Sequence, residues 1–280
     1  MDFEKAKKRY EERKAPPELL REVNKMFQKK NKMKIIVASV VAVFGVFAVT
    51  LNVNVAFAKT LSEVPGFSGI VKVLTGNRYA FHENTFDAEV DVPEIAGLKD
   101  VELQKKLNQE FRDYADTIMA GFQADVKAMK DEYGEDSGHL GVDVGYAVKT
   151  NNEKILALDL YVVNTVASSS TVHKFYTIDK KENRLITLDS LFCEGSDYVG
   201  VISPYIKSEM KRANEEEGAS YWIQDEFGDN FKAIKVNQNF YLNEAGNLVI
   251  VFDKYEVAPG YMGAPEFVIP NDVIESILKV

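Results

Sequence analysis

The most pronounced pattern in the chain is an uncharged, apolar run over residues 35–58. An α-helix of that length rises roughly 36 Å at about 1.5 Å per residue, which is enough to cross a hydrocarbon core of about 30 Å. Lysines cluster just before the run, at positions 29, 30, 32 and 34. By the positive-inside rule, we expect a single-pass cell-membrane protein with residues 1–34 in the cytoplasm and residues 59–280 outside the cell.

The end of this run carries a second pattern, Ala56-Phe57-Ala58-Lys59. Ala56 and Ala58 are small residues at the two positions that signal peptidase reads, directly before Lys59. A secretory signal normally begins near the N-terminus, whereas 34 residues precede this run. The sequence therefore predicts a retained signal anchor that also holds a cleavage site.

Two short helices are predicted before the span. Residues 2–14 are charged, and Pro17 suits the first turn of a second helix. The apolar face of this second helix has a spacing of three to four residues and consists of Leu19, Leu20, Val23, Met26 and Phe27. Because so short a helix is marginal alone, this face needs a partner. It either lies on the membrane surface or docks in a groove of a cytoplasmic protein.

After the span, residues 61–74 are apolar, but the stretch is short and Pro65-Gly66 interrupts it. The stretch is either an interfacial helix or the first core element of the outer domain. We assign residues 59–78 to a juxtamembrane segment and residues 79–280 to an extracellular sensor domain. Apolar and polar residues alternate over residues 79–92, which predicts a pair of strands.

The helical pattern is clearest over residues 101–129, where apolar side chains recur every three or four positions. Asp100 is a favourable N-cap for this helix. One apolar face on a long helix indicates a core helix that lies on a sheet.

Alternating segments follow this helix and predict antiparallel strands over residues 140–149, 154–165 and 171–179. Further along, the pattern predicts a helix over residues 198–214, strands over 240–242 and 248–252, and a helix after Pro270. Strands and helices are partly segregated along the chain. The expected fold class of the outer domain is therefore α+β, an antiparallel sheet with packed helices, preceded by one transmembrane helix and a short helical cytoplasmic segment.

The formal net charge of −9 is unevenly distributed. Residues 1–34 hold 12 Lys and Arg against 6 Asp and Glu, which is a net charge of +6. Because the span holds no charge, residues 59–280 carry a net charge of −15. The outer charge favours encounter with a basic macromolecule, although a soluble, self-repelling surface would have the same composition.

Catalytic and metal-binding motifs are weak. The three histidines are scattered, and the sequence contains no His-Glu-x-x-His motif, cysteine cluster, phosphate-binding loop or nucleophile elbow. The single cysteine, Cys193, excludes an intramolecular disulfide, and we expect it to be a small, partly buried residue. The sequence indicates a protein that is not an enzyme and that uses no metal or cofactor.

Two segments have the composition of recognition loops. The first forms a row of hydroxyls between two predicted strands and consists of Ser168, Ser169, Ser170 and Thr171. The second, residues 255–263, sets an aromatic side chain among Pro and Gly residues, and its candidate contact residues are Pro259, Gly260, Tyr261 and Met262. Tyr and Ser on a stiff loop are favoured contact residues. The alternative is a pair of ordinary turns, with Tyr261 folded back on the core.

Several motifs together resemble one known family. They are Pro17-Glu18-Leu19, the Ala-Phe-Ala exit of the span, the run Phe175-Tyr176-Thr177-Ile178-Asp179-Lys180-Lys181, and residues 253–263, which read Asp-Lys-Tyr-Glu-Val-Ala-Pro-Gly-Tyr-Met-Gly. With these motifs, essentially the whole chain resembles the RsiV-type anti-sigma factors. Members of this family are membrane-anchored regulators of an extracytoplasmic-function sigma factor, and they sense lysozyme.

The resemblance implies a complete signalling scheme. The inner segment, through the apolar face that begins at Leu19, would hold the sigma factor inactive, and the outer domain would bind C-type lysozyme. Binding would permit signal peptidase to cut at Ala56-Phe57-Ala58, and a site-2 protease would then cut within the membrane. Transcription for envelope stress and lysozyme resistance would follow. We expect the two recognition segments to enter or rim the lysozyme cleft, and we expect no direct contact with nucleic acid.

The outer domain of this family also resembles a module found ahead of polysaccharide deacetylase domains. No deacetylase domain follows in this sequence, so we expect no deacetylase activity. The alternative function is that of a membrane-anchored protein that binds or modifies cell-wall glycan, in which the same segments would contact peptidoglycan.

Overall fold

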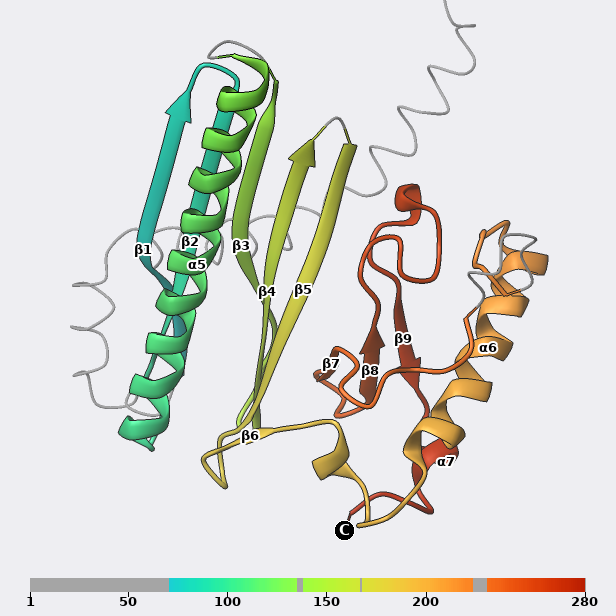
Figure 1. Cartoon of the computed structure of the whole chain (residues 1–280). Helices are drawn as coiled ribbons and strands as arrows, with labels where there is room; N and C mark the ends of the chain where they lie inside the picture. Colours follow the sequence, from blue (N-terminus) through green and yellow to red (C-terminus); the bar gives the residue numbers. More distant parts are fainter. Residues whose placement is uncertain (1–70, 135–137, 167, 224–230, 280) are drawn as a thin grey trace, which may run out of the picture. The chain divides into compact units, whose positions relative to one another are not determined.

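The computed structural model describes residues 71–134, 138–166, 168–223 and 231–279. Figure 1 shows two sheets, each with a long helix beside it. The strands of the first sheet are β1 Lys72–Glu83, β2 Phe86–Ala96, β3 Leu140–Asn151, β4 Ile155–Val166, β5 Ser168–Asp179 and β6 Arg184–Ile186. Those of the second are β7 Phe240–Leu242, β8 Leu248–Val251 and β9 Glu266–Ile269. The helices are α5 Val101–Tyr133, α6 Tyr198–Glu216 and α7 Asn271–Ile274, with short 3-10 turns η1 Asp189–Leu191 and η2 Gly260–Met262.

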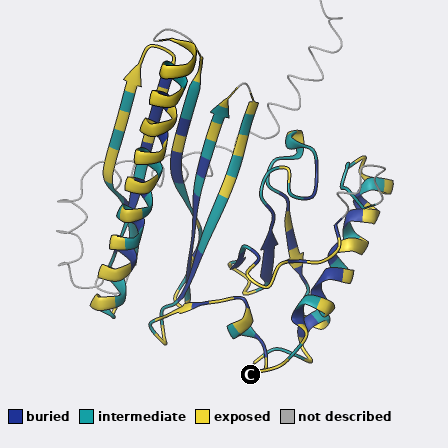
Figure 2. Ribbon diagram, in the orientation of Figure 1, coloured by how far each residue is buried: buried dark blue, intermediate teal, exposed yellow. Residues whose placement is uncertain are grey.

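Helix α5 confirms the helix predicted over residues 101–129 and extends it by one turn. Its N-cap is Asp100, whose side chain accepts hydrogen bonds from the backbone N–H groups of Glu102 and Leu103. One face of α5 is buried against the first sheet, and its apolar members include Leu107, Phe111 and Phe122. Figure 2 shows this stripe, with exposed residues on the opposite side of the helix.

The first sheet is mixed, which corrects the expectation of a purely antiparallel sheet. The strand order is β1-β2-β3-β4-β5-β6, and every pair is antiparallel except β2 with β3. Between these two strands the chain passes through α5. A helix of that length carries the chain back to the end at which β2 began, so β3 starts there and runs parallel to β2.

The β1–β2 hairpin confirms the predicted strand pair but begins earlier. Strand β1 starts at Lys72, inside the segment 59–78 that we expected to be juxtamembrane. Val71 and Leu74 are only 4% and 5% exposed, and Val71 packs in the core under α5. The end of the apolar stretch 61–74 is therefore the first core element of this domain.

The β4–β5 hairpin is tighter than the sequence indicated. Its ladder runs from Ile155 opposite Asp179 to Val166 opposite Ser168. Ser168–Thr171 therefore begin a strand, and their expected position in a loop is wrong. The long, unbroken register extends both strands to the tip because each added pair satisfies backbone groups that a loop would leave to solvent.

The second sheet has the order β7-β8-β9, with both pairs antiparallel. It packs with α6 around a separate core that includes Ile202, Ile206, Phe252 and Phe267. Strand β9 has no counterpart in the sequence analysis, because its four residues lie between Pro265 and Pro270 and are too short to show a period. Helices α6 and α7 confirm the predictions at residues 198–214 and after Pro270.

Cys193 is exposed, which corrects the expectation that it is partly buried. Phe192, directly before it, has an extended backbone and is 1% exposed. In an extended chain, neighbouring side chains point to opposite sides, so burial of Phe192 directs Cys193 toward solvent.

The residues that the structure describes include no helix long and apolar enough to cross a membrane. The predicted span, residues 35–58, lies outside the described residues. So do the predicted helices before it.

Candidate functional site

The two predicted recognition segments lie next to each other, joined by residues at the end of the second sheet. Lys254 reaches from the loop after β8 to Ser169 at the start of β5. Its Nζ donates to both the carbonyl and the hydroxyl oxygen of Ser169, each at 2.8 Å. The hydroxyl groups of Tyr255 and Ser168 lie 3.4 Å apart. Segments separated by 85 positions in the sequence thus form one surface.

The start of β5 alternates in exposure. Ser168 and Ser170 are exposed, whereas Ser169 and Thr171 are half-buried. This is the period of two that a strand imposes on its side chains. Two hydroxyls therefore face solvent at the hairpin tip, and Ser169 is left to contact Lys254.

Loop 253–263 is shaped by an uncommon backbone conformation at Tyr255. Its φ is +70°, in the left-handed region that bulky side chains rarely adopt. The Tyr255 ring lies against Gly260 so closely that a Cβ at residue 260 would stand 2.2 Å from its Cζ. Gly260 is thus required at this position, because any side chain would displace the ring.

Tyr261 stands at the tip of this loop, in the 3-10 turn η2, and is 75% exposed. Its hydroxyl donates to Oγ of Ser220 at 2.6 Å, and the N–H of Ser220 donates to Sδ of Met262 at 3.4 Å. The loop is therefore tied to the segment that follows α6. Tyr261 projects its ring into solvent, and the alternative in which it folds back on the core is wrong.

The base of the loop is fixed by Asp253 and Glu256. Asp253 accepts from the N–H of His173 on β5 at 2.8 Å, while its own N–H donates to Glu256 at 2.8 Å. Glu256 also forms an ion pair with Lys235 at 2.7 Å. Burial raises the pKa of Asp253 above its ordinary value of 3.8, even though the His173 amide opposes the shift.

His173 connects the two sheets through both its backbone and its side chain. Its carbonyl accepts from Asn239 at 2.9 Å, and its Nδ1 lies 3.0 Å from a carboxylate oxygen of Asp159 on β4. Burial lowers the pKa of His173, but the hydrogen bond and charge of Asp159, with the charges of Asp253 and Glu266, raise it above its ordinary value of 6.5. The protonated imidazole is favoured at this junction.

Aromatic stacking continues this junction beneath the surface. The rings of His173 and Phe175 stack with centroids 6.1 Å apart, and those of Phe175 and Tyr241 with centroids 5.7 Å apart. Tyr241 belongs to β7, so the stack crosses from one sheet to the other. Packing of this kind holds β5 and the second sheet together below the candidate surface.

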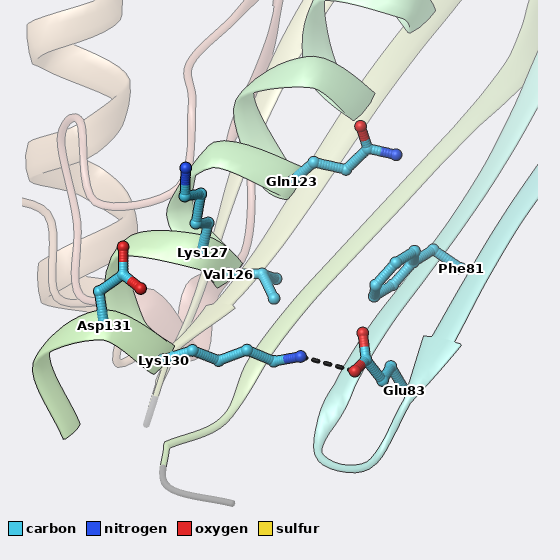
Figure 3. A pocket seen from close by; sticks show the side chains of 7 residues that line it. All are labelled: Phe81, Glu83, Gln123, Val126, Lys127, Lys130 and Asp131. Atoms are coloured by element: carbon cyan, nitrogen blue, oxygen red, sulfur yellow. Dashed lines mark hydrogen bonds and ion pairs between the residues drawn. The ribbon is translucent and has the colours of Figure 1, made fainter. Parts of the chain in front are cut away.

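A separate hollow of about 280 Å³ lies between the end of β1 and the last turns of α5 (Figure 3). Lys130 reaches across it and forms an ion pair with Glu83 at 2.6 Å. Phe81 and Val126 line its apolar side. The ion pair of Lys130 with Glu83 therefore fastens the last turns of α5 to the β1–β2 hairpin.

Among the residues that the structure describes, no three His, Cys, Asp or Glu side chains are grouped so that they could hold a metal ion. Several predicted site residues lie outside that part of the chain. They are the predicted sigma-factor face Leu19, Leu20, Val23, Met26 and Phe27 and the predicted cleavage site Ala56, Ala58 and Lys59.

Sequence reasoning found the two segments but missed the residues that connect them. Lys254 and Ser220 were not singled out, nor was the group of His173, Asp159 and Asp253. Lys254 directly precedes the predicted segment 255–263, and a cation next to Tyr255 is only a weak signal. The other contacts join distant positions, and no local spacing could have revealed them.

Two known protein families match separate parts of the described chain, one in the first sheet and one around the second. Residues 80–164 match the family described as deacetylase PdaC, and residues 189–272 match the family described as a protein of unknown function (DUF3298). The fold is similar to the crystal structure of a DUF3298 family member from Bacteroides fragilis NCTC 9343, with a TM-score of 0.55 and 15% identity. That match covers 76% of this chain and 95% of the other. It supports the α+β fold alone.

Two curated proteins from Bacillus subtilis (strain 168) are similar in sequence. Peptidoglycan-N-acetylmuramic acid deacetylase PdaC is 21% identical over 178 residues, which cover 62% of this chain but only 37% of that enzyme. Anti-sigma-V factor RsiV is 34% identical over 281 residues, which cover 99% of this chain and 96% of RsiV. Because this second identity extends through nearly the whole of both proteins, the chain belongs to the RsiV family of anti-sigma factors.

Proposed function

We propose that this anti-sigma factor is a single-pass membrane protein whose outer domain binds C-type lysozyme. Residues 35–58 would span the membrane and residues 1–34 would sequester an extracytoplasmic-function sigma factor. The observation that carries the lysozyme assignment is the joined surface of Ser168–Thr171 and Pro259–Met262. It presents hydroxyls and one projecting tyrosine on a well-fixed base, which is favoured contact chemistry for a protein cleft.

The charge of the outer residues supports this partner. C-type lysozyme is strongly basic, and residues 59–280 carry a net charge of −15. Opposite long-range fields raise the association rate and weaken with salt. We therefore expect lysozyme to bind more slowly as the ionic strength rises.

Release of the sigma factor would follow from proteolysis. In this proposal, lysozyme binding shifts the segment around Ala56–Lys59 toward an extended state that signal peptidase can cut, by at most its differential affinity for the two states. A site-2 protease then cuts the remaining span. The protein itself acts as a binding protein and not as an enzyme.

The first experiment is a pull-down of purified residues 59–280 with lysozyme and, separately, with insoluble peptidoglycan. Retention by lysozyme is the expected result. Retention by peptidoglycan alone would favour the alternative function, a wall-glycan-binding protein. The match of residues 80–164 to the deacetylase PdaC family is the observation that keeps this alternative open.

Tyr261 offers the sharpest test of the proposed lysozyme surface. Tyr261→Ala should weaken lysozyme binding by about tenfold or more, since exposed aromatic anchors often contribute over 1–2 kcal/mol. Tyr261→Phe keeps the ring and loses only the bond to Ser220, so it should bind nearly as well as the native protein. Calorimetry that gives equal affinities for all three proteins would remove Tyr261 from the site.

The cleavage site and the sigma-factor face need tests in cells. Ala56→Phe with Ala58→Phe should block lysozyme-dependent cleavage, because signal peptidase requires small residues at both positions.

Leu20→Glu with Val23→Glu should release sigma-dependent transcription without lysozyme. If repression persists in the second variant, the apolar face of residues 19–27 belongs to the membrane.

A further inference from the structure

A groove of about 620 Å³ runs beside α6, and its lining residues take no part in the proposed lysozyme surface. One wall is a face of the helix, where Lys207 and Lys211 lie one turn apart and Ser208 follows Lys207. The facing wall is Tyr221 and Ile223, from the segment after the helix. The volume is within the range of small-molecule sites.

The two lysines of this groove are available to a ligand, unlike the neighbouring arginine. Arg212 lies on the same helix and is engaged by Glu209 at 3.1 Å and by Glu217 at 2.7 Å. Among the described residues, Lys207 has no carboxylate partner, and Lys211 has only a loose contact at 3.8 Å with Glu215, in which both side chains are more than 60% exposed. With two lysines and one glutamate in its lining, the groove carries a net formal charge of +1, although residues 59–280 as a whole carry −15.

Tyr221 gives the groove a preformed aromatic wall. Its backbone N–H and carbonyl are both held by the side chain of Asn214, at 2.8 and 2.9 Å. Its ring packs against Phe267 of β9, with centroids 5.4 Å apart. Because Asn214 and Phe267 already hold Tyr221 in place, its ring would lose little conformational freedom when a flat ligand packs against it.

We propose that this groove binds a saccharide that carries an anionic group, either a carboxylate or a phosphate. The Tyr221 ring would pack on the apolar face of a sugar ring. Lys207 and Lys211 would donate charge-assisted hydrogen bonds to the anion, and Ser208 would contact a sugar hydroxyl. Glu215 in the lining disfavours a polyanion and favours a ligand that carries one anionic group beside neutral hydroxyls.

The groove adjoins the proposed lysozyme surface without sharing residues with it. Ser220 is next to Tyr221. Its hydroxyl accepts a hydrogen bond from the Tyr261 hydroxyl, and its N–H donates to Sδ of Met262. A ligand that shifts Tyr221 would therefore act on the base of the Tyr261 loop. Binding at the groove nevertheless does not require the lysozyme assignment to be correct, so the two proposals can fail separately.

The test uses the full chain in detergent micelles and four probes, with affinities measured by calorimetry. The probes are the disaccharide N-acetylglucosaminyl-N-acetylmuramic acid, N-acetylglucosamine 6-phosphate, neutral diacetylchitobiose and inorganic phosphate. We expect one or both acidic sugars to bind at least about tenfold more tightly than the neutral sugar and phosphate, because two charge-assisted hydrogen bonds add to the stacking. The tighter acidic sugar identifies carboxylate or phosphate as the preferred anion.

Variants locate the binding in the groove. The double variant Lys207→Gln with Lys211→Gln should lose about tenfold or more of the affinity for the acidic sugar, while Glu215→Gln should tighten it. Arg212→Gln is the control, since it removes one positive charge from the same helix outside the groove lining and should leave the affinity unchanged. Circular dichroism checks that each variant is folded.

Four outcomes would overturn the proposal. The first three are equal binding of the neutral and acidic sugars, binding of inorganic phosphate as tight as that of the acidic sugars, and unchanged affinity in the double lysine variant. The fourth is that neither acidic sugar binds. Lysozyme binding by the same protein is measured separately and decides only the function proposed above.

Discussion

The two segments of the candidate binding surface are held in place by different means. Ser168–Thr171 are paired residue by residue with β4, from Val166 to Val163, so the backbone ladder fixes them. Residues 253–263 have no such ladder. One backbone hydrogen bond, from the N–H of Trp222 to the carbonyl of Val257 at 2.9 Å, reaches this loop from outside. Otherwise its position depends on side chains, notably Asp253, Lys254 and the packing of Tyr255 on Gly260.

This difference predicts where each segment tolerates change. A strand held by backbone hydrogen bonds keeps its place when an outward side chain is replaced. A loop held by side chains moves when one of them is removed, because few other contacts replace the lost one. Sequence changes should therefore be accepted more readily at Ser168 and Ser170 than at the base of the loop.

The largest expected effect is at Phe252, which directly precedes the loop. Phe252 is 1% exposed and packs edge-to-face on Phe231 and Phe267. Phe252→Ala should lower the free energy of unfolding by about 3–5 kcal/mol. Urea unfolding measures this value.

Leu158→Ala, in the core of the first sheet, should lower the free energy of unfolding by about 2–5 kcal/mol but leave the lysozyme affinity intact below the melting temperature.

Gly260 and Gly263 separate close packing from backbone strain. Gly260→Ala would force the Tyr255 ring aside, so we expect a cost of about 1–3 kcal/mol and weaker lysozyme binding. A Cβ at Gly263 meets no atom within 4 Å, although its φ of +70° penalises alanine by about 1 kcal/mol. Melting curves should show both losses, and only Gly260→Ala should alter binding. Equal binding by the two variants would show that the Tyr255 ring does not shape the site.

Lys254→Met cuts the direct link between the two segments. It removes two hydrogen bonds to Ser169, and we expect a loss of about 1 kcal/mol of stability at this partly exposed position. Hydrogen exchange should accelerate in residues 253–263 and not in β5, because β4 still holds that strand. Faster exchange in both segments would contradict the comparison drawn above.

The smallest expected effect is a pH dependence at the junction. The pKa of His173 is raised in the folded state, so its stabilising contribution is complete below 6.5 and is lost as the pH rises through the raised pKa. The pKa of Asp253 is also raised in the folded state, so ionisation of this carboxyl lowers stability as the pH rises from 3.8 through the raised pKa. Urea unfolding at pH 6, 7 and 8 should show falling stability. His173→Gln should remove most of this slope, and a slope that persists would assign it to other groups.

Much of the fold could be predicted because its longer elements show a regular period of apolar and polar residues in the sequence. The 33 residues of α5 and the 12-residue strands β3, β4 and β5 are long enough for a period to appear. Short β6 and β9 have no counterpart among the predicted elements, and the run of serines at the start of β5 has the composition of a loop. The parallel pairing of β2 with β3 has no local signature, since it depends on the path of the chain between them.

The sequence by itself determined the family, the α+β class, and the two polar segments that carry the candidate contact residues. Only the tertiary structure decided that these segments adjoin, that Tyr261 projects, and that His173 ties the sheets together. Local patterning encodes which side of a helix or strand faces solvent. The contact of Lys254 with Ser169, across 85 positions, depends instead on strand order and on how the two sheets pack, and no short stretch of sequence encodes either.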